Sequence, residues 1–179
     1  PCFPFFCTPS CYTMKPTDTL RLDSPLGPMI LAATTEGLSG AWFEGQRHGP
    51  SDARMQHWIP NASNPLLQAA ADQLHAYFAG QLTRFDLPLD LSAGTPFQQS
   101  VWQALLNVTA SQTQSYGGLV QQLNNPKAVR AVGSAVGRNP VTIIVPCHRI
   151  LGAGGQLTGY AGGLWRKEAL LKLEGHTAV

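Results

Sequence analysis

Cys147 and His148 are neighbours at the end of an apolar run, and together they could do nucleophilic chemistry. A thiol must lose its proton before it attacks an electrophile, and a histidine beside a carboxylate is the usual base. Pro146 fixes its own φ and favours an extended Val145, so the thiol is held on a rigid corner. Adjacent side chains of an extended chain point to opposite sides, so a water or a non-extended turn would have to connect thiol and imidazole.

Glu174 is the nearby carboxylate with an unusual position in the sequence. It falls in the last turn of an expected helix, where the helix dipole disfavours a negative charge. Such a local violation indicates a role elsewhere, such as orienting His148. The alternatives are a surface Glu174, a packed core His148 and an inert core Cys147.

The N-terminal half shows the pattern of a small sheet followed by a helix. Residues 19–44 alternate with period two between turn signals, which predicts an antiparallel meander. Residues 45–63 are polar and mixed, and we expect a loop with a short helix there. A helix is predicted after Asn64, its N-cap, with a stop at Gly80. Residues 81–94 should form a short strand or a linker.

The C-terminal half predicts several short helices. Residues 95–98, with the sequence TPFQ, form a capping box with proline at the first helical position. Ser115 should cap a second helix that ends near Leu123. Asn124 and Asn125 then break this helix, because Asn tolerates the left-handed conformation.

A third helix is expected from Pro126 to Gly137, with Val129, Val132 and Val136 on its apolar face. Two short helices separated by a tight turn predict a helix-turn-helix. The small residues of this helix would permit close approach to a nucleic-acid backbone. The alternative is an ordinary small-residue helix packed in a core.

Three further segments follow the helix-turn-helix. Residues 141–145, apolar except for one Thr, predict a buried strand. Residues 152–163 form a glycine-rich loop, and residues 164–174 predict a last helix closed by Gly175. The apolar residues of that helix are Leu170, Leu171 and Leu173.

Charge is divided unevenly between the two halves, although the formal net charge is only +2. Residues 1–94 carry five Lys and Arg against eight Asp and Glu, and residues 95–179 carry seven against two, which gives −3 and +5. Between Asp90 and Glu168 lie 77 residues with six cations and no carboxylate. This asymmetry indicates a polyanionic partner for the second half, and chance in a charge-poor chain is the alternative.

The first residues of the chain carry three of its four cysteines, at positions 2, 7 and 11. Their spacing, with no histidine nearby, fits no usual zinc site, so no metal is predicted. Residues 1–13 are rich in Pro and Phe and predict a disordered tail or a non-native extension, with Met14 as the native initiator. They lack the basic start and long apolar core of a signal peptide.

The sequence VPCHRI at residues 145–150 resembles the active-site motif of the O6-alkylguanine-DNA alkyltransferases, also called methylated-DNA–protein-cysteine methyltransferases. Four further motifs resemble the family's recognition helix, hinge, substrate loop and closing helix. They are KAVRAVG at 127–133, GRNP at 137–140, TGYAGG at 158–163, and KEALL with LEG at 167–171 and 173–175. The match covers roughly residues 95–175 in order and spacing. Residues 19–94 match more loosely, through SPLGP at 24–28 and YFAG at 77–80.

The resemblance implies a role for each matched residue of the reactive centre. Cys147 would accept the alkyl group from guanine O6 irreversibly. His148 would act as the base through a water, and Glu174 would hold its orientation. Asn139 would brace the turn between recognition helix and active-site strand. Tyr116 would hydrogen-bond the guanine ring and help push out the 3′ phosphate.

The resemblance also implies how DNA is held. Because the alkyl group cannot be reached inside a duplex, the base must be extruded, and Arg130 would fill the gap that it leaves. The helix would enter the minor groove, with Ala128 and Ala131 permitting close approach. Lys127 and Arg138 would contact phosphates.

The substrate pocket that the resemblance implies surrounds the extruded base. Tyr160 would form its wall, and the backbone N–H of Ala161 would meet O6, because the departing guanine needs protonation or hydrogen bonding. Val145 and Arg149 would also line the pocket.

Three positions depart from the family's pattern. Residues 108–111 replace a usual Pro-x-Gly turn, Asn124 stands where Gly is frequent, and Val120 stands where Ala is common. The reactive residues are unaffected. Some relatives bind a structural zinc in the first domain, but no matching ligand set is present in this sequence.

We therefore expect an α/β (α+β) protein. A small ribonuclease-H-like sheet-and-helix domain (14–92) should support a winged-helix-like domain (93–179) that binds DNA and accepts the alkyl group. The expected substrate is double-stranded DNA carrying O6-alkylguanine, with O4-alkylthymine as a second lesion. No cofactor and no membrane contact are expected. The protein should be monomeric and cytoplasmic, or nuclear in a eukaryote.

Two rival functions use the same residues differently. One is a non-enzymatic lesion binder of the alkyltransferase-like type, against which Cys147 argues because those proteins lack the cysteine. The other is a Cys-His hydrolase or thiol redox sensor, in which the helices would be only scaffold.

Overall fold

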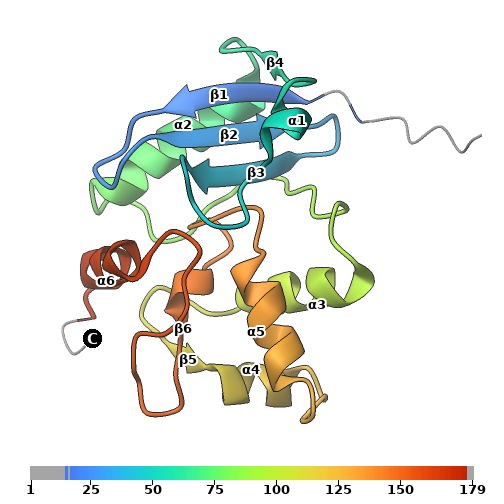
Figure 1. The fold of residues 1–179 in the computed structure, drawn as a ribbon. Helices are drawn as coiled ribbons and strands as arrows, with labels where there is room; N and C mark the ends of the chain where they lie inside the picture. Colours follow the sequence, from blue (N-terminus) through green and yellow to red (C-terminus); the bar gives the residue numbers. More distant parts are fainter. Residues whose placement is uncertain (1–14, 16, 177–179) are drawn as a thin grey trace, which may run out of the picture.

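The computed structural model describes Lys15 and residues 17–176 (Figure 1). The tail predicted for residues 1–13, its three cysteines and Met14 lie outside the described residues. A sheet with a long helix stands above a group of shorter helices in Figure 1. The mixed α/β fold with a helical second domain is confirmed, and the exact division at residues 92 and 93 stays a prediction.

Four strands form the N-terminal sheet in the order β3-β2-β1-β4. The first three are antiparallel neighbours, which confirms the predicted meander; they are β1 (Asp18–Leu22), β2 (Met29–Ala33) and β3 (Leu38–Phe43). The sequence did not predict β4 (Ile59–Pro60), which pairs parallel to β1. A strand of two residues is too short to show a period.

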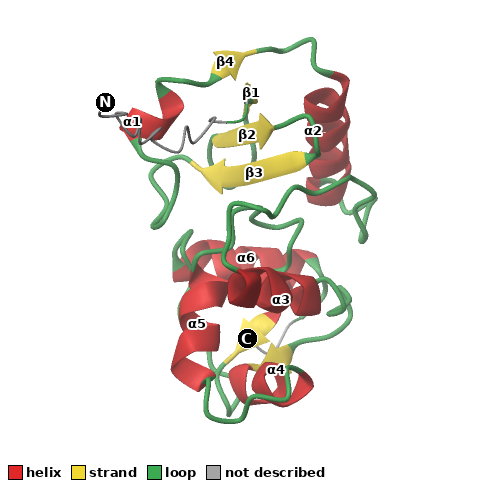
Figure 2. Ribbon diagram, turned by 90° about the vertical axis from the view of Figure 1, so that its right-hand side faces the viewer, coloured by secondary structure: helices red, strands yellow, loops and turns green. Residues whose placement is uncertain are grey.

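The helix α2 (Pro65–Phe78) packs along one face of the sheet (Figure 2). The Asn64 side chain accepts hydrogen bonds from the first backbone N–H groups of the helix, and Gly80 has a φ of +71° just beyond its end, so both predicted boundaries are confirmed. Its buried side chains are Leu67, Ala70, Ala71, Leu74 and Tyr77. The short helix expected in residues 45–63 is α1 (Asp52–Met55).

The C-terminal half is built mainly from short helices. They are α3 (Pro96–Leu105), α4 (Tyr116–Gln122), α5 (Val129–Gly137) and α6 (Leu164–Leu173). Two short strands, β5 (Gln114–Ser115) and β6 (Ile150–Leu151), pair in parallel. Trp102 Nε1 of α3 donates a hydrogen bond to the carbonyl oxygen of Ala135 in α5 at 2.9 Å, which fixes these two helices against each other.

Helices α4 and α5 form the predicted helix-turn-helix, but α5 begins at Val129 rather than at Pro126. Asn124 has a φ of 51°, as expected for the break after α4. The next residues form a further turn, in which the Ala128 N–H donates to the Asn125 carbonyl at 3.0 Å. The fixed φ of proline suits a turn as well as a first helical residue, so the sequence pattern could not separate the two.

The apolar face of α5 differs from the prediction at Val129, which is 47% exposed. Val132 and Val136 are buried as expected, together with Ala135. Val129 is exposed because it is the first residue of the helix, at the end farthest from the sheet (Figure 1).

The strand predicted for residues 141–145 was wrong, although all five residues are buried. The Val145 N–H donates to the Val141 carbonyl at 2.9 Å and closes a turn, in which Ile143 has a φ of +75°. Val141 makes only an isolated bridge, to Ala41 of β3. A short apolar run without a period is compatible with a buried strand or a buried turn, and here the domain interface buries a turn.

Two smaller expectations are also resolved by the structure. Residues 81–94 form a linker, with a single bridge between Leu89 and Leu38. Leu173 is 39% exposed instead of lying on the apolar face, because α6 ends at this residue. Within residues 17–176 no helix combines the length and the apolar character needed to cross a bilayer.

The two halves of the chain are bonded directly to each other. The Ala41 N–H donates to the Pro140 carbonyl at 2.9 Å, and the Thr142 N–H donates back to the Ala41 carbonyl at 2.8 Å. The guanidinium of Arg166 lies over the ring of Phe43 at 4.5 Å. The sheet therefore fixes the turn that precedes the reactive segment.

The capping box at the start of α3 gives a stability prediction. Thr95 Oγ1 accepts from the Gln98 N–H at 3.2 Å, and Gln98 Oε1 accepts from the Thr95 N–H at 2.9 Å. Thr95→Ala removes the first bond and should lower the free energy of unfolding by about 1 kcal/mol in urea denaturation. Thr95→Ser keeps an acceptor oxygen and should remain near wild type, so equal losses in both variants would contradict the capping role.

Candidate active site

Cys147 is the free thiol of the described chain, and only 5% of its surface is exposed. Residues Cys147–Arg149 form a single 3-10 turn directly after Pro146. This is the non-extended turn that a connection between the thiol and His148 requires. The reactive segment is therefore buried and compact rather than extended.

The Asn139 amide holds both ends of the buried turn before Cys147. Its Nδ2 donates to the Val145 carbonyl at 2.7 Å, and its Oδ1 accepts from the Val141 N–H at 2.9 Å. Nδ2 also donates to Cys147 Sγ at 3.1 Å. The strained φ of Ile143 is thus stabilised by a side chain that also directs a donor toward the sulfur.

The Glu174 carboxylate is buried between His148 and Arg149. Its Oε1 lies 3.0 Å from His148 Nε2 and 2.7 Å from Arg149 Nη2, and its Oε2 lies 2.9 Å from Arg149 Nε. The structure thus brings together the carboxylate and imidazole that the sequence paired. Arg149, predicted to line the substrate pocket, directs its guanidinium to Glu174 and to the carbonyl oxygen of Val108.

The proton positions follow from these contacts. Burial alone would raise the pKa of Glu174, but hydrogen bonds from His148 and Arg149 hold the pKa at about 2, so the group is a carboxylate that only accepts. His148 Nε2 therefore donates its N–H to Glu174. His148 Nδ1 is left as an acceptor, and it has no hydrogen-bond partner among the described residues.

Burial sets the resting state of the base and the nucleophile. It lowers the pKa of His148 below 6.5, against the opposing effect of Glu174, so the imidazole is neutral at pH 7 and can accept a proton. It raises the pKa of the Cys147 thiol, against the hydrogen bond from Asn139 and the charge of Lys167. The resting thiol is protonated and needs a base before it can attack.

Two tyrosines lie close to the loop predicted to hold the substrate. Tyr116 of α4 donates its hydroxyl to the Gly159 carbonyl at 3.5 Å. The Tyr160 hydroxyl is buried without a hydrogen-bond partner in the described chain, and burial and the nearby Cys147 raise the Tyr160 pKa. Ala161 is half-buried, and its carbonyl accepts from the Arg47 N–H at 3.0 Å. A buried hydroxyl without a protein partner is available to a bound base.

Lys167 belongs to this region and was not predicted. It is fully buried, and its Nζ donates to the carbonyl oxygens of Ile150 and Thr158, so it ties the strand after the reactive turn to the substrate loop. Burial lowers the Lys167 pKa to about 8. Its position three and four residues before Leu170 and Leu171 places it on the buried face of α6, and this spacing was the available sequence signal.

The helix-turn-helix presents an exposed cationic surface. Lys127, Arg130 and Arg138 are exposed with Ala131, while Ala128 is half-buried. None of the ion pairs found in residues 15 and 17–176 involves these three cations. The predicted DNA-binding residues are therefore accessible and are not neutralised by carboxylates.

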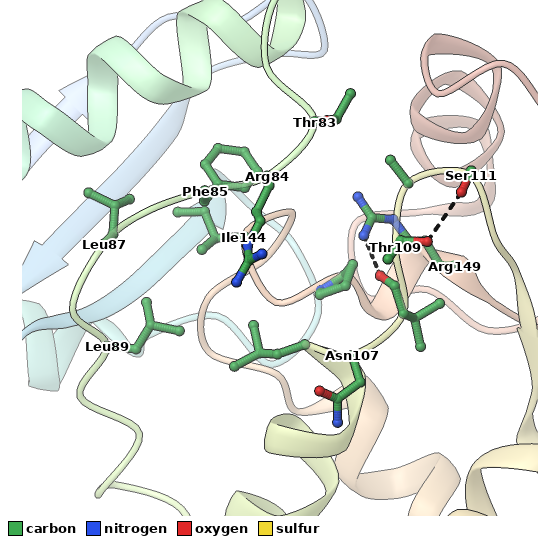
Figure 3. A pocket seen from close by; sticks show the side chains of 14 residues that line it. Thr83, Arg84, Phe85, Leu87, Leu89, Asn107, Thr109, Ser111, Ile144 and Arg149 are labelled. Carbon is green, nitrogen blue, oxygen red and sulfur yellow. Dashed lines mark hydrogen bonds between the residues drawn. The ribbon is translucent and has the colours of Figure 1, made fainter.

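A cavity of about 680 Å³ opens between residues 83–89 and residues 106–111 (Figure 3). Among the predicted site residues only Arg149 lines it, and Cys147 does not. We do not assign the alkylated base to this cavity.

No group of three or more His, Cys, Asp and Glu within the described part of the chain is arranged to hold a metal ion.

The position of the thiol relative to the helices narrows the class of protein. The reactive turn follows α5 after a short buried turn, and exposed cations suited to phosphate lie on α5 at Arg130 and beside it at Lys127 and Arg138. A buried thiol beside a histidine and a carboxylate, following a helix with exposed cations in the chain, is the arrangement expected of a nucleic-acid-binding protein that performs chemistry on its bound substrate.

The chain belongs to the 6-O-methylguanine DNA methyltransferase family. Residues 96–176 match the family model described as 6-O-methylguanine DNA methyltransferase, DNA binding domain. Residues 20–91 match that described as 6-O-methylguanine DNA methyltransferase, ribonuclease-like domain. The resemblance seen in the sequence is thereby confirmed for both halves.

Relatives and solved structures agree with this assignment. Methylated-DNA--protein-cysteine methyltransferase of Mycobacterium bovis is 51% identical over 86% of this chain and 89% of its own length, and that of Methanosarcina acetivorans is 48% identical over 86% and 95%. A crystal structure of Mycobacterium tuberculosis O6-methylguanine methyltransferase is 48% identical and covers 93% of this chain and 96% of its own, with a TM-score of 0.78. A structure of Mycobacterium tuberculosis OGT in complex with DNA is 49% identical, covers 88% and 91%, and has the same TM-score.

Replacing Glu174 by Gln should destabilise the protein and change its response to acid. The variant leaves buried Arg149 without its counterion, which should cost about 3–5 kcal/mol. Because the folded pKa of Glu174 is about 2 and its ordinary value is 4.5, the carboxylate stabilises the fold above pH 4.5, and this contribution is lost as pH falls toward 2. The variant should lack this part of the acid dependence.

Urea unfolding at a series of pH values measures both effects. The matched control is Glu168→Gln, because Glu168 makes an exposed pair with Lys172 at 2.6 Å and should contribute little. An acid profile of the Glu174 variant with the same shape as that of wild type would contradict the prediction.

Proposed function

We propose that this chain repairs double-stranded DNA by taking the alkyl group of O6-alkylguanine onto Cys147, once per molecule. The observation on which the proposal rests is the buried Cys147–His148 turn with Glu174 on the far side of the imidazole. Family membership and the DNA complex of the Mycobacterium tuberculosis relative support the substrate class.

The reaction balances with the groups that the site contains. A bond forms between Cys147 sulfur and the alkyl carbon as the bond from that carbon to guanine O6 breaks, and the electron pair goes to guanine. The thiol proton passes through a water to Nδ1 of His148. The departing guanine takes up one proton from solvent, and the imidazolium returns its proton to solvent after transfer, so no proton is gained or lost overall. Glu174 stabilises the imidazolium, and the thioether product makes the step irreversible.

Access to the buried sulfur requires the base to leave the duplex. In the proposed complex α5 lies in the minor groove, where Ala128 and Ala131 permit close approach, and Arg130 occupies the gap in the stack. Lys127 and Arg138 contact phosphates, which is consistent with their exposure.

The extruded base is proposed to lie between Tyr116 and the substrate loop. Tyr160 has a buried hydroxyl to offer, and the Ala161 N–H is assigned to O6. Val145 is buried beside the sulfur-bearing turn, and Arg149 acts on the pocket through Glu174. O4-alkylthymine is proposed as a second lesion.

The protein is proposed to act as a monomer. Its proposed location is the cytoplasm, or the nucleus of a eukaryote, because a nucleophilic thiol needs a reducing compartment. The lesion-binder rival is opposed by the presence of Cys147. The hydrolase or redox-sensor rival gives no role to the exposed cations on and beside α5.

Peptide mass spectrometry after incubation with duplex DNA containing O6-methylguanine tests the reaction. The peptide with Cys147 should gain the mass of one methyl group, in an amount not exceeding one per protein molecule, and Cys147→Ser should show no gain. Tight binding of the lesion without transfer would support the lesion binder. Ester hydrolysis or a reversible disulfide would support the thiol-hydrolase or redox rival.

Arg130→Ala should separate base extrusion from chemistry. Without the side chain that fills the stack, repair of duplex DNA should slow by roughly tenfold or more, while reaction with the free alkylated base should change little. Single-turnover rates with both substrates measure this. The control is Arg84→Ala, which removes another exposed cation and should leave both rates near wild type. An equal loss with both substrates in Arg130→Ala would refute the role in extrusion.

A further inference from the structure

The buried carboxylate of Glu174 also receives a hydrogen bond from the other half of the molecule. Tyr77, in the last turn of α2, donates its hydroxyl to Glu174 Oε1 at 2.8 Å. This is the same oxygen that lies 3.0 Å from His148 Nε2 and 2.7 Å from Arg149 Nη2. Tyr77 and Glu174 are 97 residues apart in sequence, and Tyr77 is only 2% exposed.

We propose that Tyr77 is a positioning residue for alkyl transfer, through which the N-terminal domain holds the Glu174 carboxylate in line with His148. The proposal rests on the proposed function, because it assumes that His148 accepts the thiol proton. It assigns to the N-terminal half a direct part in the site, beyond the supporting role expected from the sequence.

The Tyr77 ring is buried against aromatic neighbours that restrict its movement. It packs against Phe78 and Phe85, with ring centroids 5.5 Å and 5.4 Å away. α2 itself is anchored on the sheet by its fully buried face. The orientation of the hydroxyl is therefore determined by the folding of the N-terminal half, and Glu174 meets a donor that is already in place.

The neutral hydroxyl stabilises the carboxylate without adding charge to a buried site. Glu174 is balanced by Arg149, and Lys167 is the other cation that acts on His148. Burial and the adjacent Glu174 raise the pKa of Tyr77 far above neutrality, so it remains a donor at every working pH. A second cation at this position would oppose protonation of His148, whereas a phenol does not.

Loss of the hydroxyl has a defined electrostatic consequence. Without the Tyr77 donor, Oε1 has only His148 and Arg149 as partners, so its negative charge acts more strongly on the imidazole. This change should raise the pKa of His148 and move the acid limb of the rate profile to higher pH. The carboxylate also loses one of its fixed contacts, which should slow transfer on the plateau.

Tyr77→Phe leaves the other titratable groups around Glu174 and His148 unchanged. Glu174 is faced by Tyr77, which lies on α2, and by His148 and Arg149, which lie on the reactive turn. The charge of Glu174 also acts on the nearby hydroxyl of Tyr160. Lys167 acts on His148 from α6. Tyr77→Phe removes one hydroxyl and leaves all other members of this set in place.

The experiment compares wild type, Tyr77→Phe and Leu66→Ala by single-turnover methyl transfer from duplex O6-methylguanine DNA across pH, with DNA affinity measured separately. NMR of the His148 ring gives its pKa without relying on transfer. For Tyr77→Phe we expect a plateau rate lower by roughly tenfold, an acid limb and a His148 pKa shifted upward, and unchanged DNA affinity. Leu66→Ala perturbs the packing of the same helix at its other end, away from the Tyr77 ring, and should shift neither the limb nor the His148 pKa.

Each other outcome overturns the proposal. An unchanged His148 pKa and pH profile in Tyr77→Phe would show that the hydroxyl only joins the two domains. A loss of rate with matched shifts in Leu66→Ala would show a general packing effect. Full wild-type transfer in Glu174→Gln would show that His148 does not need the carboxylate, and would overturn both the proposed chemistry and the role of Tyr77. Slow transfer in Glu174→Gln together with wild-type behaviour of Tyr77→Phe would overturn the Tyr77 proposal alone.

Discussion

The buried charge of Glu174 is the constraint on which the rest of the structure depends. A carboxylate removed from water is tolerated only when several donors surround it, and here the donors come from the reactive turn and from α2. The end of α6, the 3-10 turn and the end of a helix in the other half must all meet at this one group. The two halves of the molecule therefore share a buried polar centre at Glu174.

Contacts within the protein occupy half of the cations in the carboxylate-free stretch, residues 91–167. Arg149 balances Glu174, Lys167 binds two carbonyl oxygens, and Arg166 joins the substrate loop to Phe43 and to the turn before β2. Three of the six cations are thus structural. The three exposed ones lie on or beside α5, so the charge asymmetry of the sequence overstates the charge offered to a partner but indicates the correct region.

Local signals predicted much of the fold and the reactive centre. The capping box, the meander, the helix-turn-helix and the pairing of Glu174 with His148 depend on nearby residues or on a motif, and the structure contains them. The turn at residues 141–145 was mistaken for a strand because burial at a domain interface makes any segment apolar. Tyr77 could not be found from the sequence, since its significance arises only from a contact 97 residues away.

The unpaired hydroxyl of Tyr160 links recognition to folding. Among the described residues this buried hydroxyl has no hydrogen-bond partner, and a ligand that bonds to it binds the folded chain but not the unfolded one. In the proposed function, a damaged base in the pocket is therefore also a ligand that stabilises the fold, and its concentration sets part of the protein's stability. When the restored base departs, that stabilisation departs with it, and the spent protein is left less stable than the complex from which it came.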